Sequence, residues 1–365
     1  MTIHAYTSFT YSYLGRARVL CRTLRQHHPD WVLWAVISDL PPEGVDPAGP
    51  LTEFDHILTA ADLFGADTDR WLFGHDIVEA CTAVKGRAMQ HILARPDCAK
   101  LFYFDPDIAL FNPLTPVADL LDTHAIVLTP HQGTPDAAGD IPAIRDNEIA
   151  SLNYGIFNLG FIAVSNSAEG RRFAGWWADR LRDWCHDRLD QGLFVDQKWC
   201  NLVPCFFDGV HILRDPGYNV ASWNLSQRNL HFDEGGMARI NGLPLRFFHF
   251  TKLGPVGDVM TQRYAGDNTE VYELWFWYRH AVAAATDPRI PSGWWHYGRF
   301  DNGVPIPKQA RVLYRDRPDL RDSFPDPFQS GTGSYFEWLI LSGGLLPGFE
   351  ALAAGRRGAD HGVSR

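Results

Sequence analysis

Apolar runs of strand length alternate with segments of helical periodicity through the first half of this chain. Residues 2–6 (TIHAY) form the first apolar run, and a helical pattern then continues until His28-Pro29 through Leu14, Ala17, Cys21 and Leu24. A second apolar run, WVLWAVISD at 31–39, follows with turn signals on both sides. This strand-loop-helix order predicts strands that are mostly parallel and are covered by helices.

The same order continues downstream. A tight hairpin is expected at Asn241-Gly242, with His249 at the end of its second strand. Residues 196–207 (DQKWCNLVPCFF) are expected to form a short helix that breaks at Pro204. The remaining expected strands are 53–60, 101–104, 125–129 and 156–164, and the remaining helices are 76–95 and 169–185. The predicted fold class is therefore α/β, with a mostly parallel central sheet and helices on both faces.

The character of the chain changes near residue 270. A Trp- and Tyr-rich helix is expected at 271–285, and segments rich in Pro and Gly follow it. We therefore expect a large domain over 1–270 and a smaller helical and irregular extension over 271–365. The small and charged residues of the tail 355–365 predict disorder.

Charge and cysteine usage disfavour several classes of protein. The net charge is −10, from 33 basic and 43 acidic side chains, without a block of like charges. A surface that binds nucleic-acid phosphates is therefore not expected. The six cysteines are scattered without CxxC pairs, which favours reduced thiols and a cytoplasmic location. No apolar stretch reaches the roughly 18 residues that a transmembrane helix needs.

The segment LFYFDPD at 101–107 leads an apolar strand directly into two carboxylates. Pro106 lacks an amide hydrogen and fixes its φ angle, so it ends the strand and begins a turn. Asp105 and Asp107 then converge at the carboxyl edge of the sheet, where ligands bind in such folds. Converging carboxylates beside an apolar core are costly unless a hard cation such as Mg²⁺ or Mn²⁺ lies between them. The segment therefore predicts a divalent metal site.

Two other interpretations of this segment stay open. Asp105 and Asp107 can cap a turn and the helix after it, as DP dipeptides commonly do. A hydrophobic strand that ends in DxD also opens the haloacid dehalogenase-type phosphatases, in which the first Asp is a nucleophile. That motif normally continues with Thr or Val, where this chain has Ala109, and normally lies near the start of the chain.

Five motifs follow one another in a recognisable order, namely YFDPDIALFNPLTPVADLL, YGIFNLGFIAVS, FVDQKWCNLVP, PGYNVASWN and LRFFHFTKLG. Together they resemble the retaining GT-A glycosyltransferases, particularly the glycogenin and galactosyltransferase-like family eight group. The resemblance covers roughly residues 1–255. It implies a Rossmann-like GT-A fold, with 1–270 as a catalytic domain that binds a nucleotide sugar.

The resemblance implies a metal centre. In that family the DxD carboxylates bind Mn²⁺ or Mg²⁺, which bridges the donor diphosphate, and a histidine completes the coordination. The matching residues here are Asp105, Asp107 and His249. A metal acting as a Lewis acid stabilises the charge that develops when a sugar-phosphate bond breaks. An ordinary core histidine at a strand end remains the alternative for His249.

The resemblance also implies contacts to the donor sugar. Asp196 matches the acid that holds sugar hydroxyls, and Gln197 matches the amide beneath the anomeric carbon, so both are expected to be catalytic. The family has a further acid where this chain has Lys198. Asn158 and Gly160 correspond to an Asn-x-Gly motif, where the backbone approaches the sugar closely. Gly160 can equally mark a bulge in the strand.

Five further residues are expected to bind the donor. Thr7 and Ser8 lie where the family contacts the nucleobase, which is uridine in the family, although the family has acidic residues there. Lys85, Arg87 and Lys252 are candidate partners for phosphate, and the alternative for Lys85 and Arg87 is that they hold Asp105 in place. A solvated helix face explains Lys85 and Arg87 nearly as well. Aromatic rings for an acceptor sugar are expected at Trp223, Trp294 and Trp295, with Tyr297 beside them, although core packing accounts for most tryptophans.

These features predict a metal-dependent hexosyltransferase that uses a UDP-sugar or another nucleotide diphosphate sugar. Its acceptor is expected to be a hydroxyl of a glycan, a lipid-linked sugar or a protein, in bacterial polysaccharide synthesis. Two alternatives from other classes remain. One is a phosphohydrolase with Asp105 as its nucleophile, and the other is a catalytically silent scaffold that binds a sugar nucleotide.

Overall fold

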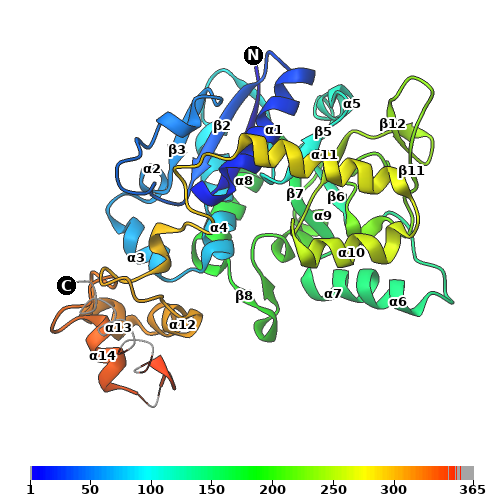
Figure 1. The fold of residues 1–365 in the computed structure, drawn as a ribbon. Helices are drawn as coiled ribbons and strands as arrows, with labels where there is room; N and C mark the ends of the chain where they lie inside the picture. Colours follow the sequence, from blue (N-terminus) through cyan, green and yellow to red (C-terminus); the bar gives the residue numbers. More distant parts are fainter. Residues whose placement is uncertain (1, 344, 350, 352–353, 355–365) are drawn as a thin grey trace.

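The computed structural model describes residues 2–343, 345–349, 351 and 354 (Figure 1). The tail 355–365, with its predicted disorder, lies outside the described residues. A seven-stranded sheet forms the centre of the fold, in the order β10-β6-β7-β4-β1-β2-β3. Its strands in chain order are β1 (Thr2–Phe9), β2 (Val32–Ile37), β3 (His56–Thr59), β4 (Cys98–Phe104), β6 (Ile126–Pro130), β7 (Phe157–Ser165) and β10 (Val210–Ile212).

The pairing of these strands confirms the predicted mostly parallel sheet. Strand β1 pairs in parallel with both β2 and β4, β2 pairs in parallel with β3, and β10 with β6. Only β7 runs against its neighbours, because it pairs antiparallel with β4 and β6. The C-terminal ends of the parallel strands therefore meet at one edge of the sheet, which is where β4 delivers Asp105.

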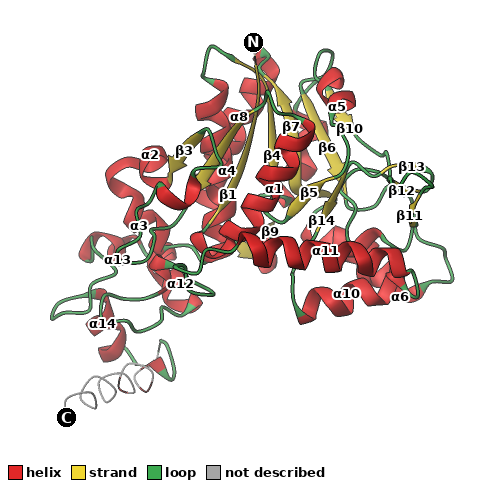
Figure 2. Cartoon of the chain, turned by 45° about the horizontal axis from the view of Figure 1, so that its top comes forward, coloured by secondary structure: helices red, strands yellow, loops and turns green. Residues whose placement is uncertain are grey.

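Helices cover both faces of the sheet (Figure 2), as predicted. Alternate residues of β4 enter different cores, because successive strand side chains point to opposite faces. Tyr103 lies in one core with α4 (Ile77–Leu93) and α8 (Ala168–Trp184). Phe102 and Phe104 lie in the other core, with α1 (Leu14–His27) and α5 (Thr115–Leu120).

Helices α4 and α8 approach each other at a glycine. A Cβ atom on Gly86 of α4 would lie only 2.7 Å from the Cα of Ala178 on α8. The backbone of α8 therefore occupies the space that a side chain would need. On α8 itself, a Cβ on Gly175 would meet no atom within 4 Å. This contact packs α4 tightly beside α8, and the N-terminal end of α4 lies near Asp105 at the end of β4.

The predicted hairpin is present, but the predicted position of His249 in it is wrong. Asn241 and Gly242 both have positive φ and connect β12 (Ala238–Ile240) to β13 (Leu243–Pro244), which pair antiparallel. The chain then leaves this small sheet, whose third strand is β11 (Leu230–Phe232). His249 ends a separate strand, β14 (Phe247–His249), which pairs antiparallel with β5 (Ile108–Leu110).

The C-terminal region packs in two places. Helix α11 (Thr269–Ala285), predicted at 271–285, shares a core with Phe248 and Phe250 and contacts α1. Helices α12 (Lys308–Asp316), α13 (Pro318–Ser323) and α14 (Tyr335–Leu341) form another apolar cluster with Phe73. Figure 1 shows these three helices beside α3 (Thr68–Phe73). The domain boundary at residue 270 stays a prediction.

Shorter elements complete the chain. A π-helical turn at Ile144–Ile149 lies between α6 (Ile141–Ala143) and α7 (Ala150–Tyr154). The segment expected as a helix broken at Pro204 is a 3₁₀-helix, Lys198–Leu202, followed by α9 (Val203–Phe206), with Pro204 in the first turn of α9. The others are α2 (Ala60–Phe64), α10 (Pro255–Ala265), β8 (Asp187–Arg188) and β9 (Leu193–Phe194), and the 3₁₀-helices Tyr11–Tyr13, Gly49–Leu51, Gly65–Asp67, Leu189–Gln191, Ser222–Asn224 and His296–Gly298. Within the described residues, no helix has the length and apolarity that crossing a membrane requires.

Candidate metal and donor site

Two strand ends bring the predicted metal ligands together. After β4 the chain turns at Pro106, where the backbone N–H of Ile108 donates to the carbonyl of Asp105 at 3.2 Å. Strand β5 then pairs with β14 so that Ile108 lies opposite His249. The backbone N–H of Phe250 donates to the carbonyl of Asp107 at 2.8 Å, which fixes this register. The pairing joins residues far apart in the sequence and places His249 beside both carboxylates.

The three side chains form a compact cluster. His249 Nε2 lies 3.1 Å from Asp107 Oδ1 and 3.7 Å from Asp105 Oδ2. One ligand atom from each residue falls within 4.8 Å of the others. Two carboxylate oxygens and one imidazole nitrogen suit Mn²⁺ or Mg²⁺ better than a soft metal. The residues present therefore fit the divalent cation that the sequence predicts.

The electrostatics of the cluster favour its charged forms. Burial lowers the pKa of His249, but the adjacent carboxylates of Asp107 and Asp105 outweigh burial and raise that pKa above its usual value. Burial likewise raises the pKa of Asp107, and the nearby imidazolium of His249 and guanidinium of Arg16 lower it below its usual value overall. Asp107 is thus held ionised, as a carboxylate ligand must be, whereas His249 must give up its Nε2 proton when it binds a metal.

Gly160 leaves room for the histidine. A Cβ atom at this position would lie 2.4 Å from His249 Cε1 and 2.8 Å from Asn158 Oδ1. The carbonyl of Gly160 also accepts a hydrogen bond of 2.7 Å from the backbone N–H of Asp105. The missing side chain on β7 therefore lets His249 approach the carboxylates. The contact of Gly160 with a donor sugar stays a prediction.

Lys85 connects the acidic cluster to Asp196. Its Nζ lies 3.1 Å from Asp105 Oδ1 and 2.8 Å from Asp196 Oδ2. The side chains of Lys85 and Asp196 are only 2% and 4% exposed, so this is a buried ion pair. Burial would lower the pKa of Lys85, but the two carboxylates raise it above its usual value. Tyr103 donates a further hydrogen bond of 2.5 Å to Asp105 Oδ1.

Two cavities flank the metal cluster. A cavity of about 230 Å³ is lined by Ser8, Lys85, the two aspartates and the ring of Tyr13. A second cavity, of about 530 Å³, is lined by Asn158, Gln197, Trp223 and Lys252, among others. Trp223 borders the cluster as well, because its ring centroid lies 5.2 Å from that of His249. Predicted donor and acceptor residues therefore line two cavities, one that includes the acidic pair and one that lies near His249.

Other predicted residues lie away from these cavities. Thr7 is buried in β1, next to Ser8, whose hydroxyl contacts Tyr103 Oη at 3.1 Å. Arg87 donates to Gln90 on its own helix. Three of the predicted acceptor rings do not line either cavity. Trp294 donates to the carbonyl of Leu40, Trp295 lies under the guanidinium of Arg311, and Tyr297 contacts Asp69.

The sequence interpretation overlooked His131 and Asn219. Asn219 has a positive φ of 52°, and its amide donates to Asn158 Oδ1 at 3.0 Å. His131 lies 3.2 Å from the amide nitrogen of Asn158 and lines the larger cavity. His131 directly follows strand β6, so its position at the carboxyl edge of the sheet could have indicated a site residue. Both residues fix the orientation of the Asn158 side chain.

Comparisons with known proteins give distant similarities. No family model matches this chain. The uncharacterised protein YfnF of Bacillus subtilis (strain 168) is 26% identical over 181 residues, which is 48% of this chain and 57% of YfnF. The match thus spans less than two thirds of YfnF. The uncharacterised protein YfnD of the same organism is 23% identical over 257 residues, 68% of this chain and 78% of YfnD.

Similar solved structures include named glycosyltransferases. The galactosyltransferase LgtC, in complex with donor and acceptor sugar analogues, shows 15% identity and a TM-score of 0.46 over 80% of this chain and 99% of LgtC. Mouse xyloside xylosyltransferase 1 shows 13% identity and a TM-score of 0.41, over 70% of this chain and 99% of that protein. The glycosyltransferase GlyE of Streptococcus pneumoniae TIGR4 shows 15% identity and a TM-score of 0.41, over 82% of this chain and 67% of GlyE.

Proposed function

We propose that this chain is a metal-dependent glycosyltransferase of the GT-A type. It transfers a hexose from a nucleotide diphosphate sugar, with a UDP-sugar favoured, to a hydroxyl acceptor. The observation that carries this proposal is the cluster of Asp105, Asp107 and His249 at the carboxyl edge of the sheet, with one cavity lined by both aspartates and a second that Trp223 connects to His249. A metal-bound diphosphate between a nucleoside pocket and a sugar pocket fits this arrangement.

The smaller cavity suits the nucleoside. It combines the ring of Tyr13 with polar groups of Ser8 and Thr10, and it opens onto Asp105 and Asp107. A base can stack on an aromatic ring while hydroxyls contact the ribose. Lys85 lies beneath the acidic pair and holds Asp105 in place through the 3.1 Å contact. Lys85 thereby positions a metal ligand.

The larger cavity suits the donor sugar and the acceptor. Gln197 donates one amide N–H to the carbonyl of Tyr154 at 2.8 Å, which leaves its carbonyl oxygen and its second N–H for other partners. A neutral carbonyl near an anomeric carbon stabilises an oxocarbenium-like state without acting as a strong nucleophile, which favours retention. Asp196 precedes Gln197 and is anchored by Lys85, so it fixes this segment.

When bound, Mn²⁺ or Mg²⁺ supplies Lewis-acid stabilisation of the departing diphosphate. Lys252 lines the larger cavity and adds a cation for the phosphate oxygens. Trp223, at the boundary between His249 and that cavity, offers a ring edge to the acceptor. The acceptor class is the hydroxyl of a glycan, a lipid-linked sugar or a protein, and a cytoplasmic role in bacterial polysaccharide synthesis accords with the proposal.

A thermal-shift panel tests the proposal. Nucleoside diphosphates and nucleotide sugars are added with and without Mn²⁺, since a ligand at a hundredfold its Kd adds about 2.7 kcal/mol of stability. We expect the largest rise in Tm with UDP plus Mn²⁺ and none in the Asp107→Asn variant. Asp119→Asn, an exposed carboxylate on α5, is the matched control and should respond like the wild type. Stabilisation that persists in EDTA would contradict the metal site.

Turnover separates the proposal from its alternatives. Incubation with a UDP-sugar and candidate acceptors should release UDP, and the Asp105→Asn variant should abolish the release. Release of phosphate from a simple monoester, lost in the same variant, would instead indicate the phosphohydrolase. Tight binding of UDP-sugars without turnover for any acceptor would indicate the scaffold.

A further inference from the structure

A cavity of about 570 Å³ lies away from the metal cluster, where the C-terminal helices meet the sheet domain. Its lining comes from α3, from the end of α8 and from α12 and α13. It shares no lining residue with the two cavities beside the metal cluster. The proposed transferase chemistry uses none of its residues.

Positive charge without a carboxylate partner gathers in this cavity. The guanidinium of Arg70 donates to the carbonyl of Arg321, and the guanidinium of Arg321 donates to the carbonyl of Arg315. Neither Arg70 nor Arg321 forms an ion pair with a carboxylate in the described part of the chain. The two lining carboxylates are each engaged, Asp183 by Arg182 and Asp316 by Arg315 and Arg188. The excess charge of the lining is therefore positive.

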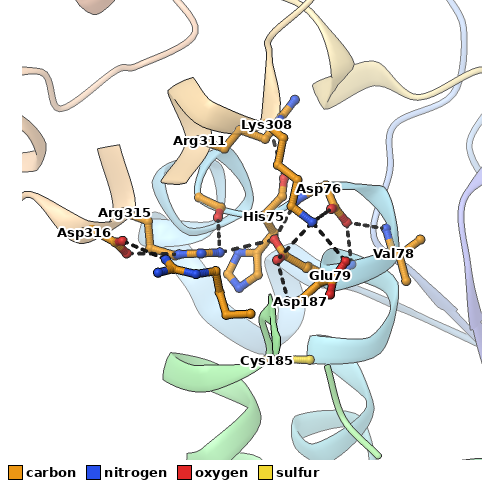
Figure 3. A network of polar contacts seen from close by, with 12 residues as sticks. His75, Asp76, Val78, Glu79, Cys185, Asp187, Lys308, Arg311, Arg315 and Asp316 are labelled. Atoms are coloured by element: carbon orange, nitrogen blue, oxygen red, sulfur yellow. Dashed lines mark hydrogen bonds and ion pairs between the residues drawn. The ribbon is translucent and has the colours of Figure 1, made fainter. Parts of the chain in front are cut away.

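The guanidinium of Arg315, with 11% of its side chain exposed, lines this cavity and pairs with a buried carboxylate. Arg315 Nη1 lies 3.2 Å from Glu79 Oε2, and Glu79 is only 1% exposed. Figure 3 shows Arg315 and Glu79 in one network with His75. Arg315 Nη2 is buried and has no hydrogen-bond partner among the described residues. Such an orphaned charged donor is costly unless a ligand accepts from it.

The imidazole of His75 is a second buried group without a full set of hydrogen bonds, and it lacks a donor. His75 is 3% exposed, and its Nδ1 lies 2.7 Å from the carbonyl of Trp71, which makes Nδ1 the protonated nitrogen. His75 Nε2 is then an acceptor, and it is buried without a partner among the described residues. A ligand hydroxyl would satisfy it. Trp184, which is 52% exposed, adds an aromatic ring to the same lining.

We propose that this cavity binds a sugar unit that carries an anionic group, either a phosphate or a carboxylate. The anion contacts Arg315 and Arg321, a ring hydroxyl donates to His75 Nε2, and the apolar face of the sugar packs on Trp184. The anion, the hydroxyl and the apolar face of the ligand are thus each inferred from different side chains of the lining. An inorganic anion alone would leave His75 and Trp184 unused, and a neutral sugar would leave Arg321 without an anionic partner and Arg315 Nη2 without an acceptor. This site is separate from the proposed donor site.

Isothermal titration calorimetry on the full chain tests the proposal. The probes are glucose 6-phosphate, glucuronate, glucose and inorganic phosphate, and EDTA is present so that metal-dependent binding at the other site is excluded. We expect one site per chain for at least one anionic sugar, with affinity about tenfold or more above that of glucose and of phosphate. Tighter binding of glucose 6-phosphate would identify the anion as a phosphate, and tighter binding of glucuronate would identify it as a carboxylate.

Variants place the binding in this cavity. Trp184→Ala removes an exposed ring and Arg321→Gln removes an uncompensated charge, and each should weaken binding by about tenfold. Arg180→Gln, on α8 but outside the lining, should change the affinity by less than about twofold. The proposal is overturned if neither anionic sugar gives saturable heat. It is also overturned if phosphate alone binds as tightly, or if both lining variants bind like the wild type.

Discussion

Gly160 sets how close His249 can come to the carboxylates. Gly160→Ala would place a methyl group 2.4 Å from His249 Cε1, so the ring must move away. We expect Mn²⁺ affinity to fall by about tenfold or more, as for lost support of a metal ligand. The free energy of unfolding should fall by about 1–3 kcal/mol because of overpacking. Metal titration and urea unfolding measure the two effects. Unchanged metal affinity would contradict the role of Gly160.

Lys85 is the cation shared by Asp105 and Asp196. Replacing it by Met leaves the buried carboxylate of Asp196 without its 2.8 Å partner. We expect Lys85→Met to lower the free energy of unfolding by about 3–5 kcal/mol. The double variant Lys85→Met/Asp196→Asn removes both charges and should recover part of that loss, as measured by urea denaturation. Additive effects in this double-mutant cycle would show that the two side chains are not coupled.

At the residue scale, the sequence predicted the acidic pair because a strand runs directly into Asp105-Pro106-Asp107. The structure brings His249 to this pair, as predicted. The partnership of Lys85 with Asp196 was not predicted, because it joins α4 to a loop more than a hundred residues later. Trp294 and Trp295 were proposed for the acceptor only because they are tryptophans, and their role stays a prediction.

At the scale of elements, the contact between α4 and α8 depends on Gly86. Gly86→Ala would bring a methyl group to 2.7 Å from the backbone of Ala178, which cannot yield as a flexible side chain would. We expect a loss of about 1–3 kcal/mol in the free energy of unfolding. Gly175→Ala on α8 is the control, because its Cβ meets open space, and it should stabilise by about 0.5–1 kcal/mol. Equal effects at both glycines would contradict the close packing.

Periodicity predicted the main helices and the central strands because each pattern is local. The predicted helix 76–95 is Ile77–Leu93, and the predicted strand 156–164 is Phe157–Ser165. The pairing of β14 with β5 escaped prediction because its partners, Phe247 and Leu110, are distant in the chain. The hairpin turn at Asn241-Gly242 is a local signal, but the departure of the chain after Pro244 is decided by tertiary packing.

At the scale of the whole molecule, buried neutral histidines make stability depend on pH. Burial lowers the pKa of His28, His75 and His131 to about 4 and that of His186 to about 2. The unfolded chain binds these protons below about pH 6.5 and the folded chain does not, so stability falls as the pH drops from about 6.5 to 4. His75 alone accounts for about 3 kcal/mol. Burial raises the pKa of Asp39 to about 7 and also raises that of Asp196, and these two carboxyl groups oppose the trend.

Urea unfolding at several pH values checks this dependence. In His28→Gln the side-chain oxygen can still accept the 2.8 Å hydrogen bond from the backbone N–H of Leu114, but it does not titrate. We therefore expect a smaller loss of stability on acidification in this variant than in the wild type. Stability that rises steadily from neutral pH to about pH 5 would show that Asp39 dominates instead.

Binding of Mn²⁺, followed by the electron paramagnetic resonance signal of the free ion, tests the central claim most directly. The account predicts one Mn²⁺ per chain in the presence of UDP, through Asp105, Asp107 and His249. The Asp107→Asn variant should lose this binding, and Asp119→Asn should retain it. Equal Mn²⁺ binding by the wild type and Asp107→Asn, or none by either, would contradict a metal centre at the end of β4.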